Sequence, residues 1–267
     1  MSTPSARGGT YAERLYDMHC HLDFFEDPAL IAEQAAQLEL GILAVGVTPE
    51  NYVELTGTLD ERAGVRCAVG AHPSWIAGAR GGTADVERAC ALIEHCRFVG
   101  EVGLDFSEKN MLPGAKEAQV AAFTQIGEAC AQRGDCVVSI HAVRSASCAL
   151  DILETTGAIT NCSCIFHWFT GSSDELWRAI RAGAWFSVNE RQLATKRGRE
   201  YARLIPADKL LLESDLPAED GSGARNAQDI VMSLEQTLTH LAECRNQDPA
   251  ALRDILASNS EHLLNHS

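Results

Sequence analysis

The sequence lacks several features that would assign it to a common class of protein. No run approaches the roughly 18 apolar residues that a membrane span needs, and no glycine-rich GxGxxG phosphate loop is present. The ten cysteines include no CxxC pair, and the first fifteen residues contain no apolar signal-peptide core. Basic residues are scarce, because 22 lysines and arginines against 37 acidic residues give a net charge of −15. We therefore expect no membrane association and no broad nucleic-acid-binding surface, and the cysteine usage predicts a reducing, cytoplasmic location.

The length and composition favour one folded domain. A chain of 267 residues with 46% hydrophobic and 22% charged residues has the balance of a globular protein with a sizeable core. Barrels of roughly 250 residues routinely form a single domain. We predict a flexible N-terminal extension over residues 1–14 and a single domain over residues 15–267.

Short apolar or β-rich runs alternate along the chain with stretches of helical periodicity, such as 30–38 and 120–130. Strands that alternate with helices indicate βαβ units and a parallel sheet, and eight such units close naturally into a barrel. The predicted fold is an α/β protein of the (β/α)8 TIM-barrel type, with an open doubly wound sheet as the alternative. The predicted strands are Leu15–Leu22, Gly41–Thr48, Arg66–Pro73, Phe98–Phe106, Cys136–Val143, Cys162–Phe169, Trp185–Asn189 and Lys209–Asp215.

Residues that begin and end helices support this alternation. Asp27-Pro28 predicts an N-cap followed by proline at the first helical position. Ser172 and Glu175 have the spacing of a capping box. The glycines predicted at helix C-termini are Gly41, Gly134, Gly157 and Gly183.

Polar residues gather at the C-terminal ends of the predicted strands, where a barrel enzyme has its active site. His19 and His21 lie two residues apart on the first strand, so their side chains project to the same face and can hold one cation together. Asp17 shares that face, where its carboxylate is placed to orient a ligand imidazole. Such histidine pairs also occur by chance in many proteins, so the motif alone does not establish a metal site.

Four further residues at strand ends strengthen the metal interpretation. His141 and His167 end the fifth and sixth strands, and the four imidazoles would repel one another if protonated, unless they share divalent cations. Glu101 lies within an apolar strand and Asp215 ends the last one, where a buried carboxylate needs a partner. The alternatives are structural: packed histidines, a salt bridge from Glu101 to an arginine, and a helix N-cap at Asp215.

Five short motifs, in order and at strand ends, resemble the signatures of the TatD family of metal-dependent deoxyribonucleases, which belongs to the amidohydrolase-type barrels. The resemblance runs from about Leu15 to the C-terminus, where Asn259 lies in a segment similar to a closing family motif. The five motifs are Asp17–Leu22, Gly70–Pro73, Gly100–Asp105, His167–Gly171 and Leu212–Pro217.

The resemblance implies a metal-dependent hydrolase with two divalent ions, which would be zinc, manganese or magnesium. The implied catalytic residues are Asp215, which would accept a proton from a water held between the ions, and Glu101. Glu213 would lie beside Asp215, and His72 would contact the substrate, with a packed structural histidine as the alternative. The implied ligands are His19, His21 and Asp215 for one ion and His141 and His167 for the other, with Glu101 bridging the two.

The sequence departs from the family pattern at positions that concern the substrate. The family usually has an arginine two residues after the strand-five histidine, whereas Val143 stands there and Arg144 follows it. We predict substrate contacts by this displaced Arg144 and by Arg225, which precedes an asparagine as in the family. Trp168 replaces a commoner cysteine. The basic residues within Arg191–Arg199 are either a solvated helix face or the local basic rim that a phosphodiester needs.

Three functions are compatible with these residues. The family resemblance favours the first, exonucleolytic hydrolysis of phosphodiester bonds, with DNA or a small phosphodiester as the partner. The second is hydrolysis of a small amide, ester or lactone by the same metal chemistry, which the acidic net charge favours. The third is a non-catalytic metal-binding barrel, but no implied ligand is missing. Strongly salt-dependent binding of DNA would separate the first from the second. The sequence indicates no obligate protein partner.

Overall fold

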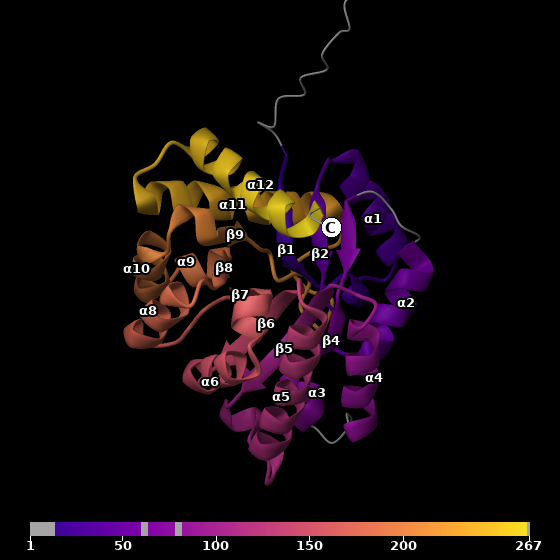
Figure 1. Cartoon of the computed structure of the whole chain (residues 1–267). Coiled ribbons are helices and arrows are strands. Elements are labelled where there is room, and N and C mark those ends of the chain that lie inside the picture. The colour runs from indigo at the N-terminus through magenta and orange to yellow at the C-terminus, as the bar shows by residue number, and fades with distance from the viewer. Residues whose placement is uncertain (1–13, 60–63, 78–81, 266–267) are drawn as a thin grey trace, which may run out of the picture.

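The computed structural model describes residues 14–59, 64–77 and 82–265. Within these ranges, parallel strands lie at the centre and helices surround them (Figure 1). The strands are β1 (Tyr16–Cys20), β2 (Gly41–Ala44), β3 (Val65–Cys67), β4 (Val69–Ala71), β5 (Phe98–Asp105), β6 (Val137–Val143), β7 (Ser163–His167), β8 (Trp185–Val188) and β9 (Leu210–Leu212).

Helices follow the strands in alternation. The α-helices are α1 (Pro28–Gln37), α2 (Pro49–Leu59), α3 (Pro73–Ala77), α4 (Thr83–Ile93), α5 (Ala115–Arg133), α6 (Ala146–Thr156), α7 (Ala158–Asn161), α8 (Ser173–Arg181), α9 (Glu190–Leu193), α10 (Lys196–Leu204), α11 (Ala227–Arg245) and α12 (Pro249–Asn265). The 3-10 turns are η2 (Leu22–Phe24), η3 (Glu108–Asn110) and η4 (Ala207–Lys209). No helix in the described ranges is long and apolar enough to cross a membrane.

The strands pair in sequence order, as in a barrel. One sheet has the order β1-β2-β3 and the other has the order β4-β5-β6-β7-β8-β9, and every pairing is parallel. A doubly wound sheet would reverse its strand order at a switch point, and this arrangement does not. The predicted α/β barrel is confirmed. The predicted third strand, Arg66–Pro73, forms β3 and β4, which are separated only by Ala68.

Backbone hydrogen bonds beyond the strand ends connect the two sheets. The amide of Asp215 donates to the carbonyl oxygen of His19 at 3.0 Å, which joins the chain after β9 to β1. On the other side, Gly46 and Glu101 are joined by a 3.0 Å bond from the amide of Glu101 to the carbonyl of Gly46. The first and last strands are therefore connected where the predicted active-site residues lie.

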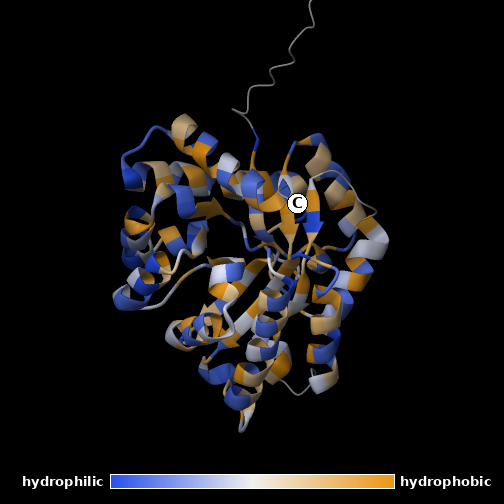
Figure 2. Cartoon of the chain, in the orientation of Figure 1, coloured by the Kyte–Doolittle hydropathy of each residue, from blue (hydrophilic) through white to orange (hydrophobic). Residues whose placement is uncertain are grey.

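The core consists of strand residues that are buried on both faces. All eight residues of β5 and all four of β2 are buried, and Figure 2 shows hydrophobic colouring along the central strands. Phe166 on β7 and Phe186 on β8 are each at most 1% exposed and stack with ring centroids 6.2 Å apart. This packing fixes the strands whose C-terminal ends carry the candidate site.

The predicted helix boundaries are mostly confirmed. Asp27 caps α1 by accepting from the amide of Leu30 at 3.0 Å, and Ser172 and Glu175 form the capping box of α8. Gly134, Gly157 and Gly183 follow helices in positive-φ conformations. The prediction for Gly41 was wrong, because this residue begins β2. A Cβ there would lie 2.3 Å from the ring of Tyr16, so close strand packing explains the glycine.

The predicted extension over residues 1–14 lies outside the described residues except for Arg14. The single domain over residues 15–267 stays a prediction. All ten cysteines are free thiols in the structure.

Candidate metal centre

A cavity of about 900 Å³ opens at the C-terminal ends of the strands. Its lining includes Glu101 from β5, His141 from β6 and His167 from β7. His21, just after β1, and Asp215, after β9, also line it. Residues that are far apart in the sequence therefore meet at one site, as the strand-end argument predicted.

Glu101 lies at the centre of this site, and its two carboxylate oxygens face different imidazoles. One oxygen, Oε2, is 3.5 Å from the Nε2 atoms of both His19 and His21. The other oxygen, Oε1, is close to three rings, namely His141 (Nδ1, 2.6 Å), His167 (Nε2, 2.8 Å) and His72 (Nε2, 3.4 Å).

Asp215 completes the group around the first histidine pair. Its Oδ1 is 3.7 Å from Nε2 of His19 and 3.6 Å from Nε2 of His21. Its Oδ2 faces outward and accepts a 2.8 Å hydrogen bond from Nη2 of Arg191. Each carboxylate oxygen of Asp215 thus has a different neighbour, one in the histidine cluster and one at the cavity wall.

Several of these side chains have the donor set and spacing of a metal site. The ligand atoms of His19, His21 and Glu101 lie within 4.8 Å of one another, and so do those of His72, Glu101 and His141. The Nε2 atom of His19 is buried and has no hydrogen-bond partner among the described residues. Because a buried polar atom without a partner is costly, a cation that accepts this lone pair would fit the site.

Glu101 and the imidazoles around it shift one another's pKa values. Burial alone would raise the pKa of Glu101, but the surrounding imidazoles, His72 first, hold it well below its usual range. Glu101 in turn raises the pKa of His141 and His167 against the effect of burial. Burial and the charge on His167 lower the pKa of His19. Without a metal, Glu101 therefore favours the charged form of His141 and His167, whereas His19 favours the neutral form.

His72 is distinguished from the other imidazoles by its hydrogen bonds. Its Nδ1 accepts from the backbone amide of Ser74 at 3.1 Å, and burial lowers the pKa of the ring. In the neutral ring the proton must then be on Nε2, which faces Glu101. This arrangement favours a hydrogen-bond donor at His72 over a metal ligand, even though its position within the second group would allow ligation.

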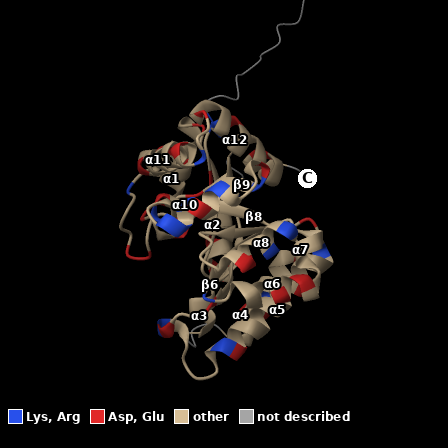
Figure 3. Cartoon of the chain, turned by 90° about the vertical axis from the view of Figure 1, so that its left-hand side faces the viewer, with Lys and Arg blue, Asp and Glu red and all other residues tan. Residues whose placement is uncertain are grey.

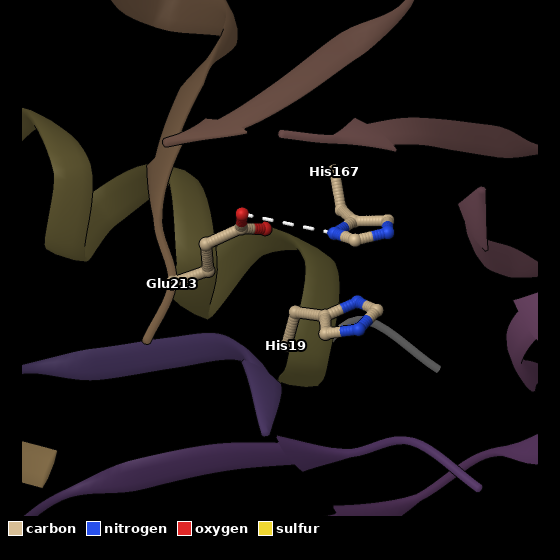
Figure 4. Close-up of side chains that lie close together, drawn as sticks. All are labelled: His19, His167 and Glu213. Atoms are coloured by element: carbon tan, nitrogen blue, oxygen red, sulfur yellow. Dashed lines mark ion pairs between the residues drawn. The ribbon is translucent and has the colours of Figure 1, made fainter. Parts of the chain in front are cut away.

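Glu213 contacts one imidazole of the cluster, that of His167. Figure 4 shows its carboxylate directed at His167, whose Nδ1 is 3.7 Å from Oε1, with the ring of His19 alongside. Glu213 is fully buried and accepts from the hydroxyl of Ser187 and from Nδ2 of Asn189, the latter at 2.7 Å. It therefore contacts His167 rather than Asp215, the neighbour that the sequence predicted for it.

Asp17 also differs from its predicted role. Its carboxylate accepts from the backbone amides of His19, at 3.1 Å, and Ser214, at 2.9 Å, instead of from an imidazole. The hydroxyl of Ser139 is the group that contacts Nδ1 of His19, at 2.8 Å. Asp17 thus ties β1 to the chain after β9 and holds the backbone of a ligand candidate.

Comparison with known proteins agrees with this geometry. The sequence model of the family described as TatD-related DNase matches residues 16–265. The chain belongs to the TatD-related DNase family. A 3'-5' ssDNA/RNA exonuclease TatD of Rahnella sp. is 28% identical over 259 residues, which cover 90% of this chain and 93% of that protein. An uncharacterized metal-dependent hydrolase, YcfH of Escherichia coli K12, is 29% identical over 219 residues, 76% of this chain and 77% of the relative.

A solved structure of a TatD homologue has the same fold as this chain. The crystal structure of the TatD homologue YJJV from Escherichia coli K12 superposes with a TM-score of 0.78 at 21% identity, covering 96% of this chain and all of that one. The TatD-related chain is accordingly a metal-dependent hydrolase that acts on ester bonds. Its membership disfavours the non-catalytic barrel and the small amide or lactone substrates.

Some residues of the TatD-type site were not singled out from the sequence. Asp105, at the end of β5, is 3.3 Å from Nε2 of His141 and accepts from Nδ2 of Asn110 at 2.7 Å. It stands in the Gly100–Asp105 motif, which was the available signal. Ser139 precedes His141 by two residues and therefore lies on the same face of β6, but its contact with His19 depends on the barrel arrangement.

The two arginines predicted as substrate contacts lie apart from the cavity lining. The guanidinium of Arg144 is 67% exposed and 3.8 Å from Glu108. Arg225 is exposed, and its backbone amide donates to Asp229 at 2.7 Å. Among the described residues that line the cavity, the arginine is Arg191 and the lysine is Lys109.

Proposed function

We propose that this TatD-family chain is an exonuclease that removes nucleotides from an end of single-stranded DNA. The observation that carries the proposal is Glu101, a carboxylate surrounded by imidazoles at the floor of an open cavity, with Asp215 beside it. The name of the Rahnella relative supports a single-stranded substrate. Figure 3 shows basic residues interspersed with acidic residues along the ribbon on the side that it displays. Single-stranded DNA whose end inserts into the cavity fits this charge distribution better than duplex DNA bound along a broad surface.

We further propose that two divalent ions, zinc, manganese or magnesium, bind here. His19, His21 and Asp215 would hold one, His141 and His167 the other, and Glu101 would contribute one oxygen to each. Imidazole and carboxylate donors suit these ions. When bound, such ions supply positive charge to a phosphoryl group and lower the pKa of water. The cytoplasm remains the predicted compartment.

The residues of the chain would then divide the remaining work. Asp215 would accept a proton from the attacking water through Oδ2, since its Oδ1 faces the histidines. His72 would donate from Nε2, because its Nδ1 is already occupied as an acceptor. Glu213 and Ser139 would keep the rings of His167 and His19 in position. A positioned proton acceptor such as Asp215 contributes roughly 10²- to 10⁴-fold to a rate.

The test combines metal content with nuclease activity. Protein purified without chelator is expected to carry close to two ions per chain, and His19→Ala and His141→Ala should each empty a different site. End-labelled single-stranded DNA should be shortened stepwise with added metal, and a circular single strand should resist. Full activity in metal-free protein would refute the metal proposal, and cutting of the circle would refute the exonuclease proposal.

A further inference from the structure

Carboxylates outnumber lysines and arginines in the lining of the cavity, although its proposed substrate is an anion. Glu101, Asp105, Asp215 and Glu219 all line it. The displaced Arg144 lies outside, and Val143 occupies the position at which the resemblance led us to expect an arginine. A phosphodiester therefore needs a cationic side chain at the cavity, in addition to any bound metal. The described lining offers two, Lys109 and Arg191, and Arg191 is the one that contacts Asp215.

Arg191 is placed to supply that charge. It extends from α9, directly after β8, and its Nη2 is 2.8 Å from Oδ2 and 3.0 Å from the carbonyl oxygen of Asp215. An anion that approaches Asp215 and Glu101 must therefore come within reach of the guanidinium. The side chain is 49% exposed, so it can exchange a carboxylate partner for a phosphate without being extracted from a packed core.

Trp168 holds this guanidinium in place. The central carbon of the guanidinium lies 4.7 Å from the centroid of the indole ring, in cation–π contact. Trp168 follows His167 at the end of β7, has a positive φ of 39°, and lines the same cavity. Stacking engages the face of a guanidinium and leaves the N–H groups along its edge available to bind a phosphate in a two-point contact.

We propose that Arg191, held by Trp168, binds the phosphate of the substrate and makes this site select phosphodiesters over neutral esters. The inference rests on the proposed nuclease function and adds to it the group that recognises the anion. In the free protein Arg191 pairs with Oδ2 of Asp215, and on binding substrate the phosphate replaces that oxygen as its partner. Oδ2, the oxygen proposed to accept the proton, thereby becomes available when substrate arrives.

The experiment compares an anionic and a neutral substrate on metal-loaded protein. The variants are Arg191→Gln, Arg191→Lys and Trp168→Leu, and the control is Arg178→Gln. Arg178 also forms a guanidinium–carboxylate pair, with Glu154 at 2.7 Å, but does not line the cavity. The substrates are bis(p-nitrophenyl) phosphate and p-nitrophenyl acetate, and binding of inorganic phosphate is measured by calorimetry together with metal content.

Arg191→Gln should lower kcat/KM for the phosphodiester by about 10- to 100-fold, the effect of one hydrogen bond to a charged group. The Kd for phosphate should rise by at least about tenfold. Turnover of the acetate should not fall, because a neutral ester does not draw Arg191 away from Oδ2 of Asp215, and the metal content should change by less than about twofold. Arg191→Lys should recover part of the loss, since it restores the charge without the planar fork. Trp168→Leu should mainly raise KM for the phosphodiester, and Arg178→Gln should match the wild type.

Two results would overturn the inference. Equal losses on both substrates would mean that Arg191 only positions Asp215, and unchanged phosphate binding would mean that it does not contact the anion. If the wild type hydrolyses the acetate but neither the phosphodiester nor DNA, the nuclease proposal fails. The phosphate-binding comparison then still decides whether Arg191 recognises an anion.

Discussion

The imidazole rings of His19 and His167 stack face to face, with centroids 4.0 Å apart and planes inclined by 14°. Two protonated rings at this separation would repel each other. Burial and the neighbouring His167 lower the pKa of His19, whereas Glu101 raises that of His167 well above its usual value despite burial. In the metal-free protein, His167 therefore keeps a proton that a metal must displace.

Metal binding should consequently release protons. Neutral imidazole is the ligand, so raising the pH favours binding and lowering it favours the proton on His167. Calorimetric titration of the apoprotein with Zn²⁺ at pH 7, repeated in buffers of different ionisation enthalpy, should give a release of about one proton or more per chain. The apparent affinity should weaken as the pH falls from 8 to 6. Binding without proton release would contradict the assignment of the charge to His167.

His72 should prove to be a donor and not a ligand. Because Ser74 occupies its Nδ1, the other nitrogen carries the proton and cannot bind a metal at the same time. His72→Ala should leave the metal content unchanged and lower kcat by roughly 10²-fold, at the lower end of the range for a lost proton donor. His72→Gln retains an N–H donor and should recover part of the rate. Loss of one ion per chain in His72→Ala would show that this imidazole is a ligand after all.

The ligand candidates could be predicted from the sequence because strand geometry determines which side chains share a face or an edge of the sheet. Side chains two residues apart on a strand lie on the same face, which predicted that His19 and His21 lie together. The C-terminal ends of parallel strands meet at one edge, which brought His141, His167 and Asp215 to them. Each of these inferences depends on local periodicity and topology alone.

Contacts between strands could not be read in the same way. Ser139 reaches His19, and Glu213 reaches His167, because of the register and tilt of strands that are distant in the sequence. Arg191 was seen as one of several basic residues, and only the structure separates it from the exposed Arg144. Gly41 was assigned to a helix end, since glycine signals a C-terminus as readily as close packing against a ring such as Tyr16.

The stability of the fold should depend on pH through Glu175. Its carboxylate accepts from the amide of Ser172 at 2.6 Å and from that of Ser147 at 2.9 Å, so it lies at the N-termini of both α8 and α6. These bonds lower its pKa against the effect of burial. A carboxylate whose pKa is lower in the folded state adds stability above its unfolded pKa, and this stability is lost as the pH falls through the folded value.

Glu175→Gln should therefore cost about 0.5–1 kcal/mol at pH 7. The difference from the wild type should shrink as the pH falls below the usual range of a glutamate. This difference in the free energy of unfolding is measured by urea unfolding of the metal-free proteins at several pH values. Asp174→Asn is the matched control, because this exposed carboxylate lies in the same helical turn. If the loss of unfolding free energy in Glu175→Gln stays constant with pH, the packing or hydrogen bonds of the side chain, and not its charge, stabilise the fold.

Asp215→Asn separates the chemistry of the site from its architecture. Asparagine is nearly the same size and keeps an oxygen that can face His19 and His21, but it cannot take a proton from water. If Asp215 is the base, the rate should fall by roughly 10²–10⁴, while one or both ions stay bound. Thermal stability should change little, because no core volume is removed and the backbone bond from Asp215 to His19 persists.

The comparison with Arg191→Gln distinguishes two reasons for a loss of activity at Asp215. Loss of Arg191 would reduce binding of the phosphodiester and raise KM, whereas loss of the base reduces kcat for the phosphodiester and the acetate alike. Asp215→Asn should therefore show the second pattern, with phosphate affinity at least equal to that of the wild type, because the carboxylate that competes for Arg191 is gone. Near-normal kcat in this variant would place the base elsewhere, and Glu101 would be the next residue to test. Failure of the variant to fold would instead support a structural role for Asp215, as a cap for the chain that follows β9.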